Sequence, residues 1–242
     1  IPHPSIAEIL GQSGYDWVAI DMEHGSISTH QLPDLFRALE LGNTLPLVRV
    51  AQGQEKDCKQ ALDAGAGGVI IPMVESAEQL ERVRDACRWP PSGNRGVAFS
   101  RANLFGKDFD EYIEEAQQPL LVAMIEHIKS VDNLDDILSV PNLTGVYIGP
   151  ADMSSSYGMK PQFDVKEDPV FSNIKLIAKK ANEYGKIAGI HNGTTQYAKE
   201  MIDLGFKLVT ISSDFRSMSA HAQSVIDDMK DKTKKASKNE AY

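Results

Sequence analysis

The sequence has little of what marks a secreted, membrane-bound or nucleic-acid-binding protein. Its only two cysteines, Cys58 and Cys87, lack the CxxC spacing of a zinc site, so we expect reduced thiols and a cytoplasmic protein. No run approaches the roughly 18 apolar residues of a membrane span, and no signal peptide opens the chain. The 25 basic residues are outnumbered by 34 acidic ones, which argues against a nucleic-acid partner because phosphate binding needs clustered Lys and Arg.

Short β-rich runs alternate with segments of helical spacing along the whole chain. Most of the runs are continuously apolar, as parallel strands buried on both faces require. Between them, apolar residues recur at three- and four-residue intervals, as in Leu32, Leu35, Phe36 and Leu39. The expected strands are residues 17–21, 46–50, 68–72, 120–126, 145–149, 187–191 and 208–212.

This alternation predicts an α/β fold with a parallel sheet, either doubly wound or closed into a barrel. Seven units in 242 residues favour the TIM (β/α)8 barrel, as a single domain over residues 1–242 that ends in a C-terminal helix or tail. The helix expected at residues 4–12 has no strand before it. We therefore expect the first of eight strands upstream of Ile1.

Polar side chains gather where the expected strands end, which in a barrel is the catalytic edge. Glu126 and Asp152 follow adjacent strands, and two carboxylates suit a hard cation such as Mg²⁺ or Mn²⁺ that keeps several waters. Open water positions would admit a 2-oxo acid through its carboxylate and ketone. The alternative is that each carboxylate caps a helix or pairs with a surface cation.

Three further residues at these strand ends are candidates for binding and proton transfer. Arg49 can donate paired hydrogen bonds to a carboxylate or carbonyl oxygen, unless it is used in a salt bridge to Asp21 or Glu23. His24 offers a general base near neutral pH, although a histidine in such a turn is often only solvated or a cap. His191 ends another strand and could line the pocket.

Several motifs, in order along the chain, resemble the HpcH/HpaI class of aldolases. The resemblance implies a metal-dependent pyruvate aldolase on a TIM barrel that assembles as a homo-oligomer, a hexamer or a trimer. The motifs are Asp21-Met22-Glu23-His24-Gly25, Pro46-Leu47-Val48-Arg49, Leu62-Asp63-Ala64-Gly65, Pro90-Pro91-Ser92-Gly93-Asn94-Arg95-Gly96 and Ile148-Gly149-Pro150-Ala151-Asp152.

The resemblance also implies roles for individual residues. Glu126 and Asp152 match the metal ligands (for Mg²⁺, Mn²⁺ or Co²⁺), Arg49 matches the arginine on the pyruvyl oxygens, and His24 matches the base, supported by Asp63. Asp21 matches the acid that opens the Asp-x-Glu-His motif, and Gly149, Pro150 and Ala151 match a segment whose backbone contacts the substrate carboxylate. Two positions depart from the family: Met124 stands where Gln usually touches the substrate oxygen, and His127 stands where Thr is common.

The resulting hypothesis is an aldolase that forms or cleaves 4-hydroxy-2-oxo acids from pyruvate and an aldehyde. No Lys ends an expected strand at the catalytic edge, which argues against a Schiff-base mechanism. One alternative is a decarboxylase or lyase of an oxaloacetate-like diacid, which needs the same enolate stabilisation. A barrel that binds a 2-oxo acid without turnover is the other.

The irregular segment at residues 89–107 is long for a compact domain, and such loops are usually functional. Its apolar residues include Phe99, Leu104 and Phe105. We predict that it packs against a neighbouring subunit near the active-site mouth, where Arg95 or Arg101 helps to close the pocket. The alternative is a loop folded over its own barrel.

Overall fold

Seven parallel strands form one sheet in the order in which they occur along the chain. The computed structural model describes the backbone of residues 1–239 and the side chains of residues 1–230. All seven predicted strands are confirmed, each to within one residue at either end. They are β1 (Trp17–Asp21), β2 (Leu45–Arg49), β3 (Gly68–Ile71), β4 (Leu120–Ile125), β5 (Gly145–Ile148), β6 (Ile187–Asn192) and β7 (Leu208–Ile211).

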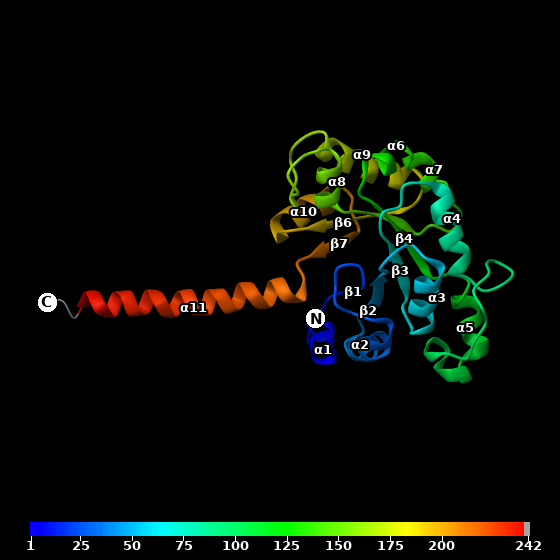
Figure 1. The fold of residues 1–242 in the computed structure, drawn as a ribbon, viewed down its shortest axis with the longest axis horizontal. Helices are drawn as coiled ribbons and strands as arrows, with labels where there is room; N and C mark the ends of the chain where they lie inside the picture. Colours follow the sequence, from blue (N-terminus) through cyan, green and yellow to red (C-terminus); the bar gives the residue numbers. More distant parts are fainter. Residues whose placement is uncertain (240–242) are drawn as a thin grey trace.

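Helices connect successive strands and cover the outer face of the curled sheet (Figure 1). Because every strand pair is parallel, each connection carries the chain from the carboxyl edge of the sheet back to its amino edge. The helices are α1 (Pro4–Gln12), α2 (Leu32–Glu40), α3 (Glu55–Asp63), α4 (Ala77–Ala86), α5 (Phe109–Glu115), α6 (Ile128–Asp132), α7 (Leu134–Leu138), α8 (Pro150–Ser156), α9 (Val170–Glu183), α10 (Thr195–Asp203) and α11 (Asp214–Asn239), with 3₁₀ turns at Thr29–Gln31 and Arg101–Gly106.

The two faces of the sheet carry alternate residues of each strand. One set packs under the helices in the larger core, with Ile71, Ile125 and Ile190 fully buried there. The other set forms a second, smaller cluster on the inner face: Leu47, Ile70, Val122, Met124 and Tyr147. By this alternation Asp21, Arg49, Glu126 and His191 stand on the inner side, at the carboxyl edge.

The fold confirms the α/β class and the parallel sheet, but not the closure of an eight-stranded barrel. Among residues 1–239, β1 and β7 each pair on one side only, and they do not pair with each other. The strand predicted upstream of Ile1 lies outside this sequence. A closed (β/α)8 barrel therefore remains a proposal.

Helix α11 is the predicted C-terminal helix, and it extends away from the rest of the molecule (Figure 1). Several of its apolar side chains are exposed within the described chain, including Phe215, Met218 and Ile226. None of the helices described here combines enough length and apolar character to cross a membrane.

The segment at residues 89–107 is anchored on its own chain, at the amino edge of the sheet. Arg95 is 1% exposed and ion-pairs with Asp63 at the end of α3, while Arg101 donates to Glu40 and to the carbonyl of Ala64. Both arginines therefore lie at the edge opposite to their own chain's Glu126, so neither closes that chain's pocket. The prediction that they close a neighbour's pocket stays a prediction.

Candidate active site

Arg49 is held in a fixed orientation by two carboxylates from the turn after β1. Its Nε donates to Oδ1 of Asp21 at 2.9 Å and its Nη2 to Oδ2 at 2.6 Å, while Nη1 lies 3.1 Å from Oε2 of Glu23. Burial alone would raise the pKa of Asp21, but the hydrogen bonds and charge of Arg49 hold it below its usual value. A guanidinium has five N–H donors, so this salt bridge leaves some of them for a ligand.

Glu126 is a carboxylate buried where a negative charge is expensive. It follows β4, is 2% exposed, and its Oε1 accepts a 2.7 Å hydrogen bond from the backbone N–H of Met73. Burial raises its pKa to about 7, and the negative charges of Asp152 and Glu23 add to the effect. When Glu126 is ionised, its buried negative charge is costly unless a positive charge lies beside it.

The segment after β5 leaves room for this carboxylate and brings Asp152 near it. A Cβ atom on Gly149 would lie 2.4 Å from Oε2 of Glu126, so the glycine clears the space that Glu126 occupies. Pro150 then begins α8, and Asp152 falls in its first turn, close enough to raise the pKa of both Glu126 and Glu23. Helix starts leave backbone N–H groups without intrahelical partners, so Ala151 and Asp152 can donate to a ligand, whereas Pro150 has no N–H.

This arrangement fits a divalent metal held by two protein ligands. Carboxylate oxygens suit hard cations, and Mg²⁺ commonly binds through one or two carboxylates while keeping waters. Within the part of the chain that the structure describes, no group of three or more His, Cys, Asp or Glu side chains is arranged to hold a metal. Water or substrate oxygens would therefore have to complete the coordination of an ion at Glu126 and Asp152.

His24 and Asp63, which the family resemblance pairs, lie at opposite edges of the sheet. His24 follows β1 at the carboxyl edge, with its side chain 68% exposed and its Nε2 3.9 Å from Oε2 of Glu23. Asp63 ends α3, five residues before β3 begins, and its Oδ1 accepts from Arg95 at 2.7 and 3.2 Å. The expectation that Asp63 supports His24 is therefore wrong within one chain, because a helix between parallel strands ends at the amino edge.

Met124 and His191 complete the inner face around the site. Met124 is buried two residues before Glu126 on β4, so it stands one layer below that carboxylate. His191 faces inward from β6, and its pKa is lowered by burial and then by the charges of Arg49 and Arg216. No sequence motif marks His191. Its place two residues after Gly189 puts both residues on the same face of β6, and this was the sequence signal that it faces inward. His127, by contrast, caps α6, where its Nδ1 accepts from the N–H of Lys129.

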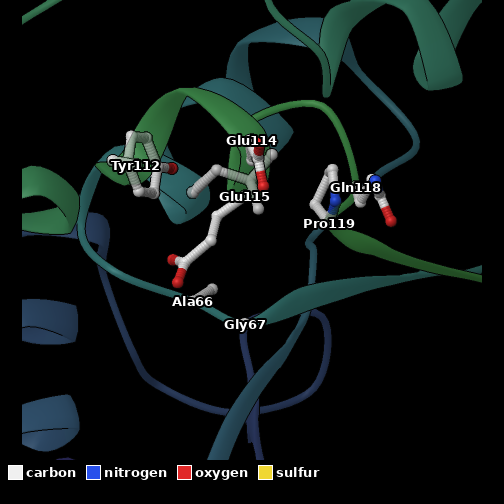
Figure 2. A pocket seen from close by; sticks show the side chains of 8 residues that line it. Ala66, Gly67, Tyr112, Glu114, Glu115, Gln118 and Pro119 are labelled. Carbon is white, nitrogen blue, oxygen red and sulfur yellow. The ribbon is translucent and has the colours of Figure 1, made fainter. Parts of the chain in front are cut away.

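A hollow of about 380 Å³ lies elsewhere, at the amino edge between α5 and the start of β3. Side chains of α5 and the segment after it lie over Ala66 and Gly67 (Figure 2). It is lined by Glu114 and Glu115 but by none of the candidate site residues. Enzymes with parallel βα units place their chemistry at the carboxyl edge, so we do not assign catalysis to this hollow.

The parallel sheet with acidic groups, an arginine and a histidine at its carboxyl edge has the arrangement of an α/β enzyme. The model of the HpcH/HpaI aldolase/citrate lyase family matches residues 2–220. The chain therefore belongs to the HpcH/HpaI aldolase/citrate lyase family, and it is an aldolase-type carbon–carbon lyase.

Named relatives agree with this assignment. The chain is 37% identical over 211 residues to a hydroxypyruvate/pyruvate aldolase of Roseobacter denitrificans, covering 86% of this chain and 81% of that one. It is 35% identical over 212 residues to the 2-keto-3-deoxy-L-rhamnonate aldolase of Escherichia coli K12, covering 86% and 78%. A crystal structure of a family member from Burkholderia cenocepacia J2315 superposes with a TM-score of 0.89 at 28% identity, covering 95% of this chain and 91% of that one.

The burial of Glu126 predicts a specific pH dependence of stability in the metal-free protein. Its pKa in the folded state, about 7, lies above the ordinary 4.5, so the folded state holds the proton more tightly than the unfolded state. This contribution is complete below pH 4.5 and is lost as the pH rises through 7. Between pH 5 and pH 8 the wild type should lose about 2 kcal/mol of unfolding free energy relative to Glu126→Gln.

Chemical denaturation in the presence of EDTA, monitored by circular dichroism at both pH values, measures this difference. Glu114→Gln removes an exposed carboxylate and serves as the control. A wild type and a Glu126→Gln variant that change in parallel with pH would contradict the assigned pKa.

Proposed function

We propose that the chain forms and cleaves 4-hydroxy-2-oxo acids, joining pyruvate to an aldehyde, with a divalent cation held by Glu126 and Asp152. The observation that carries this proposal is the buried carboxylate of Glu126, which faces two other acids at the edge where Arg49 stands. A bound divalent ion would supply Lewis acidity toward the ketone of the 2-oxo acid. The named relatives, both aldolases, support the same reaction class.

The residues of the chain supply binding and orientation around that ion. The N–H groups of Arg49 that Asp21 and Glu23 leave free would stabilise negative charge on the pyruvyl oxygen. In the Gly149-Pro150-Ala151 segment, beside Glu126, the backbone N–H of Ala151 at the start of α8 would donate to the substrate carboxylate. Asp21 positions Arg49 and also accepts the backbone N–H groups of Glu23 and His24.

His24 is our candidate for moving the C3 proton of pyruvate. Imidazole is suited to proton transfer near neutral pH, and His24 stands at the open end of the site beside Glu23. Loss of the C3 proton leaves an enolate, whose C3 forms the new bond to the aldehyde carbon while the aldehyde oxygen takes up a proton.

Decarboxylation of an oxaloacetate-like diacid is the second candidate. The observation that favours it is Met124, a buried apolar side chain one layer below Glu126, at the position where the family usually carries Gln. Breaking a C–C bond to release CO₂ requires the same enolate stabilisation but no aldehyde. A preference for oxaloacetate over every aldol substrate would favour this candidate.

We also propose that the active protein is a closed (β/α)8 barrel within a homo-oligomer. Leu104 and Phe105 are exposed apolar residues with φ of 48° and 58°, a left-handed conformation that costs energy for side chains of this kind. Phe105 is 69% exposed in the described chain. A contact with a second subunit would bury this apolar tip and stabilise its conformation.

The first test of the proposed function is turnover with and without metal. Protein with Mn²⁺ should exchange the C3 protons of pyruvate and condense it with aldehydes, and EDTA should abolish both reversibly. Asp152→Asn should weaken metal binding and remove most activity, because a hard cation loses an anionic ligand. Asp34→Asn, on the exposed face of α2, is the control. Full activity in metal-free protein would refute the metal site.

The second test concerns proton transfer. His24→Ala should lower pyruvate C3 proton exchange by about 10²–10⁴-fold, the usual contribution of a general base, while Mn²⁺ affinity stays nearly intact. Exchange followed by NMR in D₂O and metal titration by calorimetry give the two readouts. His221→Ala, on α11, is the matched control. A normal exchange rate in His24→Ala would exclude this role.

The third test concerns assembly. The double variant Leu104→Asn, Phe105→Asn removes the apolar tip, and Asn tolerates its left-handed backbone. Light scattering at micromolar concentration should show an oligomer for the wild type and smaller species for the variant. Leu41→Asn, at an exposed leucine directly after α2, should assemble normally. A fully active wild-type monomer would contradict the proposal.

A further inference from the structure

Three side chains from separate elements meet beside the candidate active site. Phe163 comes from the loop between α8 and α9, His191 from the carboxyl end of β6, and Arg216 from the first turn of α11. The ring centres of Phe163 and His191 are 5.1 Å apart, and the guanidinium carbon of Arg216 lies 5.2 Å from the centre of the Phe163 ring. Phe163 therefore contacts both Arg216 and His191, the histidine that faces the inner side of the sheet.

The charge of Arg216 is not neutralised by its surroundings. Among the residues that the structure describes, no carboxylate lies within ion-pairing distance of it, and its Nη1 is buried without a hydrogen-bond partner. The hydroxyl of Ser213, three residues earlier, is likewise buried and unpaired. Arg49 differs, because Asp21 and Glu23 both bind it.

The nearby acids are already engaged elsewhere. Asp164 accepts the backbone N–H of Gly193 at 2.7 Å and the hydroxyl of Thr194 at 2.6 Å. Asp214 pairs with the amino group of Ile1 at 2.6 Å. The described residues therefore provide no anion for the positive charge of Arg216 and no acceptor for its Nη1 donor.

The register of β5 and β6 shows how close Arg216 lies to the candidate active site. Ile148 pairs with Ile190, so the next residues, Gly149 and His191, are neighbours on the inner side, and Gly149 lies against Glu126. His191 contacts Phe163, which in turn contacts Arg216. Burial lowers the pKa of His191, and the charges of Arg49 and Arg216 lower it further. The segment expected to take the pyruvate carboxylate, Gly149-Pro150-Ala151, follows β5, and Arg216 follows β7, so β6 with His191 lies between these two strands in the sheet.

We propose that Arg216, held against Phe163, binds an acidic group on the aldehyde, so that the preferred acceptors are aldehydes that carry a carboxylate or a phosphate. This inference rests on the proposed aldol function and names its second substrate by class. A guanidinium binds either anion through paired N–H donors, which Lys reproduces in charge but not in geometry. His191 and Phe163 form the wall between the two ends of the substrate.

The experiment compares aldehydes that have the same number of carbon atoms but differ in charge, using the full chain with Mn²⁺ and pyruvate. Glyoxylate is paired with glycolaldehyde, and glyceraldehyde 3-phosphate with glyceraldehyde, so that the two pairs separate carboxylate from phosphate. The wild type should show the higher kcat/KM for the anionic member of at least one pair. In Arg216→Gln the anionic-to-neutral ratio should fall about 10- to 100-fold, as expected for a lost charged hydrogen bond. Arg216→Lys should keep part of the preference, and Arg37→Gln, on the exposed face of α2, should keep all of it.

A wild type without charge preference, or an Arg216→Gln variant with an unchanged ratio, would overturn the assignment of Arg216. Exchange of the C3 protons of pyruvate needs no aldehyde and is measured separately on the wild type. Exchange without charge preference would leave the aldol function standing and refute only the role of Arg216. Absence of both exchange and condensation would refute the function and, with it, this inference.

Discussion

The buried carboxylate of Glu126 and the positive charge that it requires organise the site. Ionised Glu126 is costly where it stands, since burial and two nearby acids oppose its charge. The surrounding residues accommodate it: Met73 donates a backbone hydrogen bond, and Gly149 leaves the space that its Oε2 fills. Arg49, in contrast, is already bound by Asp21 and Glu23. The negative charges of Glu126 and Asp152 are therefore the ones that still need a cation, which is why we propose the metal between them.

The architecture was largely predictable because parallel strands buried on both faces are continuous apolar runs. Such a run begins and ends where polar residues and turns appear, so the seven strands could be located to within one residue. The same logic identified the residues at the carboxyl edge, since Asp21, Arg49 and Glu126 end or directly follow their strands. Closure of the barrel is not confirmed, because β1 and β7 each pair on one side only among residues 1–239.

The parts of the site that escaped prediction depend on contacts between distant segments. Asp63 was assigned to the catalytic edge by resemblance, whereas its helix delivers it to the amino edge, where it pairs with Arg95. Arg216 carries no motif and follows the last strand, so only the structure reveals that it lies over Phe163. The extension of α11 away from the sheet also has no signature in sequence, because an amphipathic pattern does not say which surface its apolar face will meet.

The apolar layer beneath the charged edge has an effect beyond packing. Leu47, Ile70, Met124 and Tyr147 fill the inner face just below Arg49 and Glu126, and all four are buried. Charges that stand on such a floor interact through a medium of lower dielectric constant than water, which strengthens attraction and repulsion alike. The strength of each charge–charge interaction at the edge is therefore set partly by uncharged side chains. A polar or smaller residue in this apolar layer would weaken the local electric field without altering a single charge.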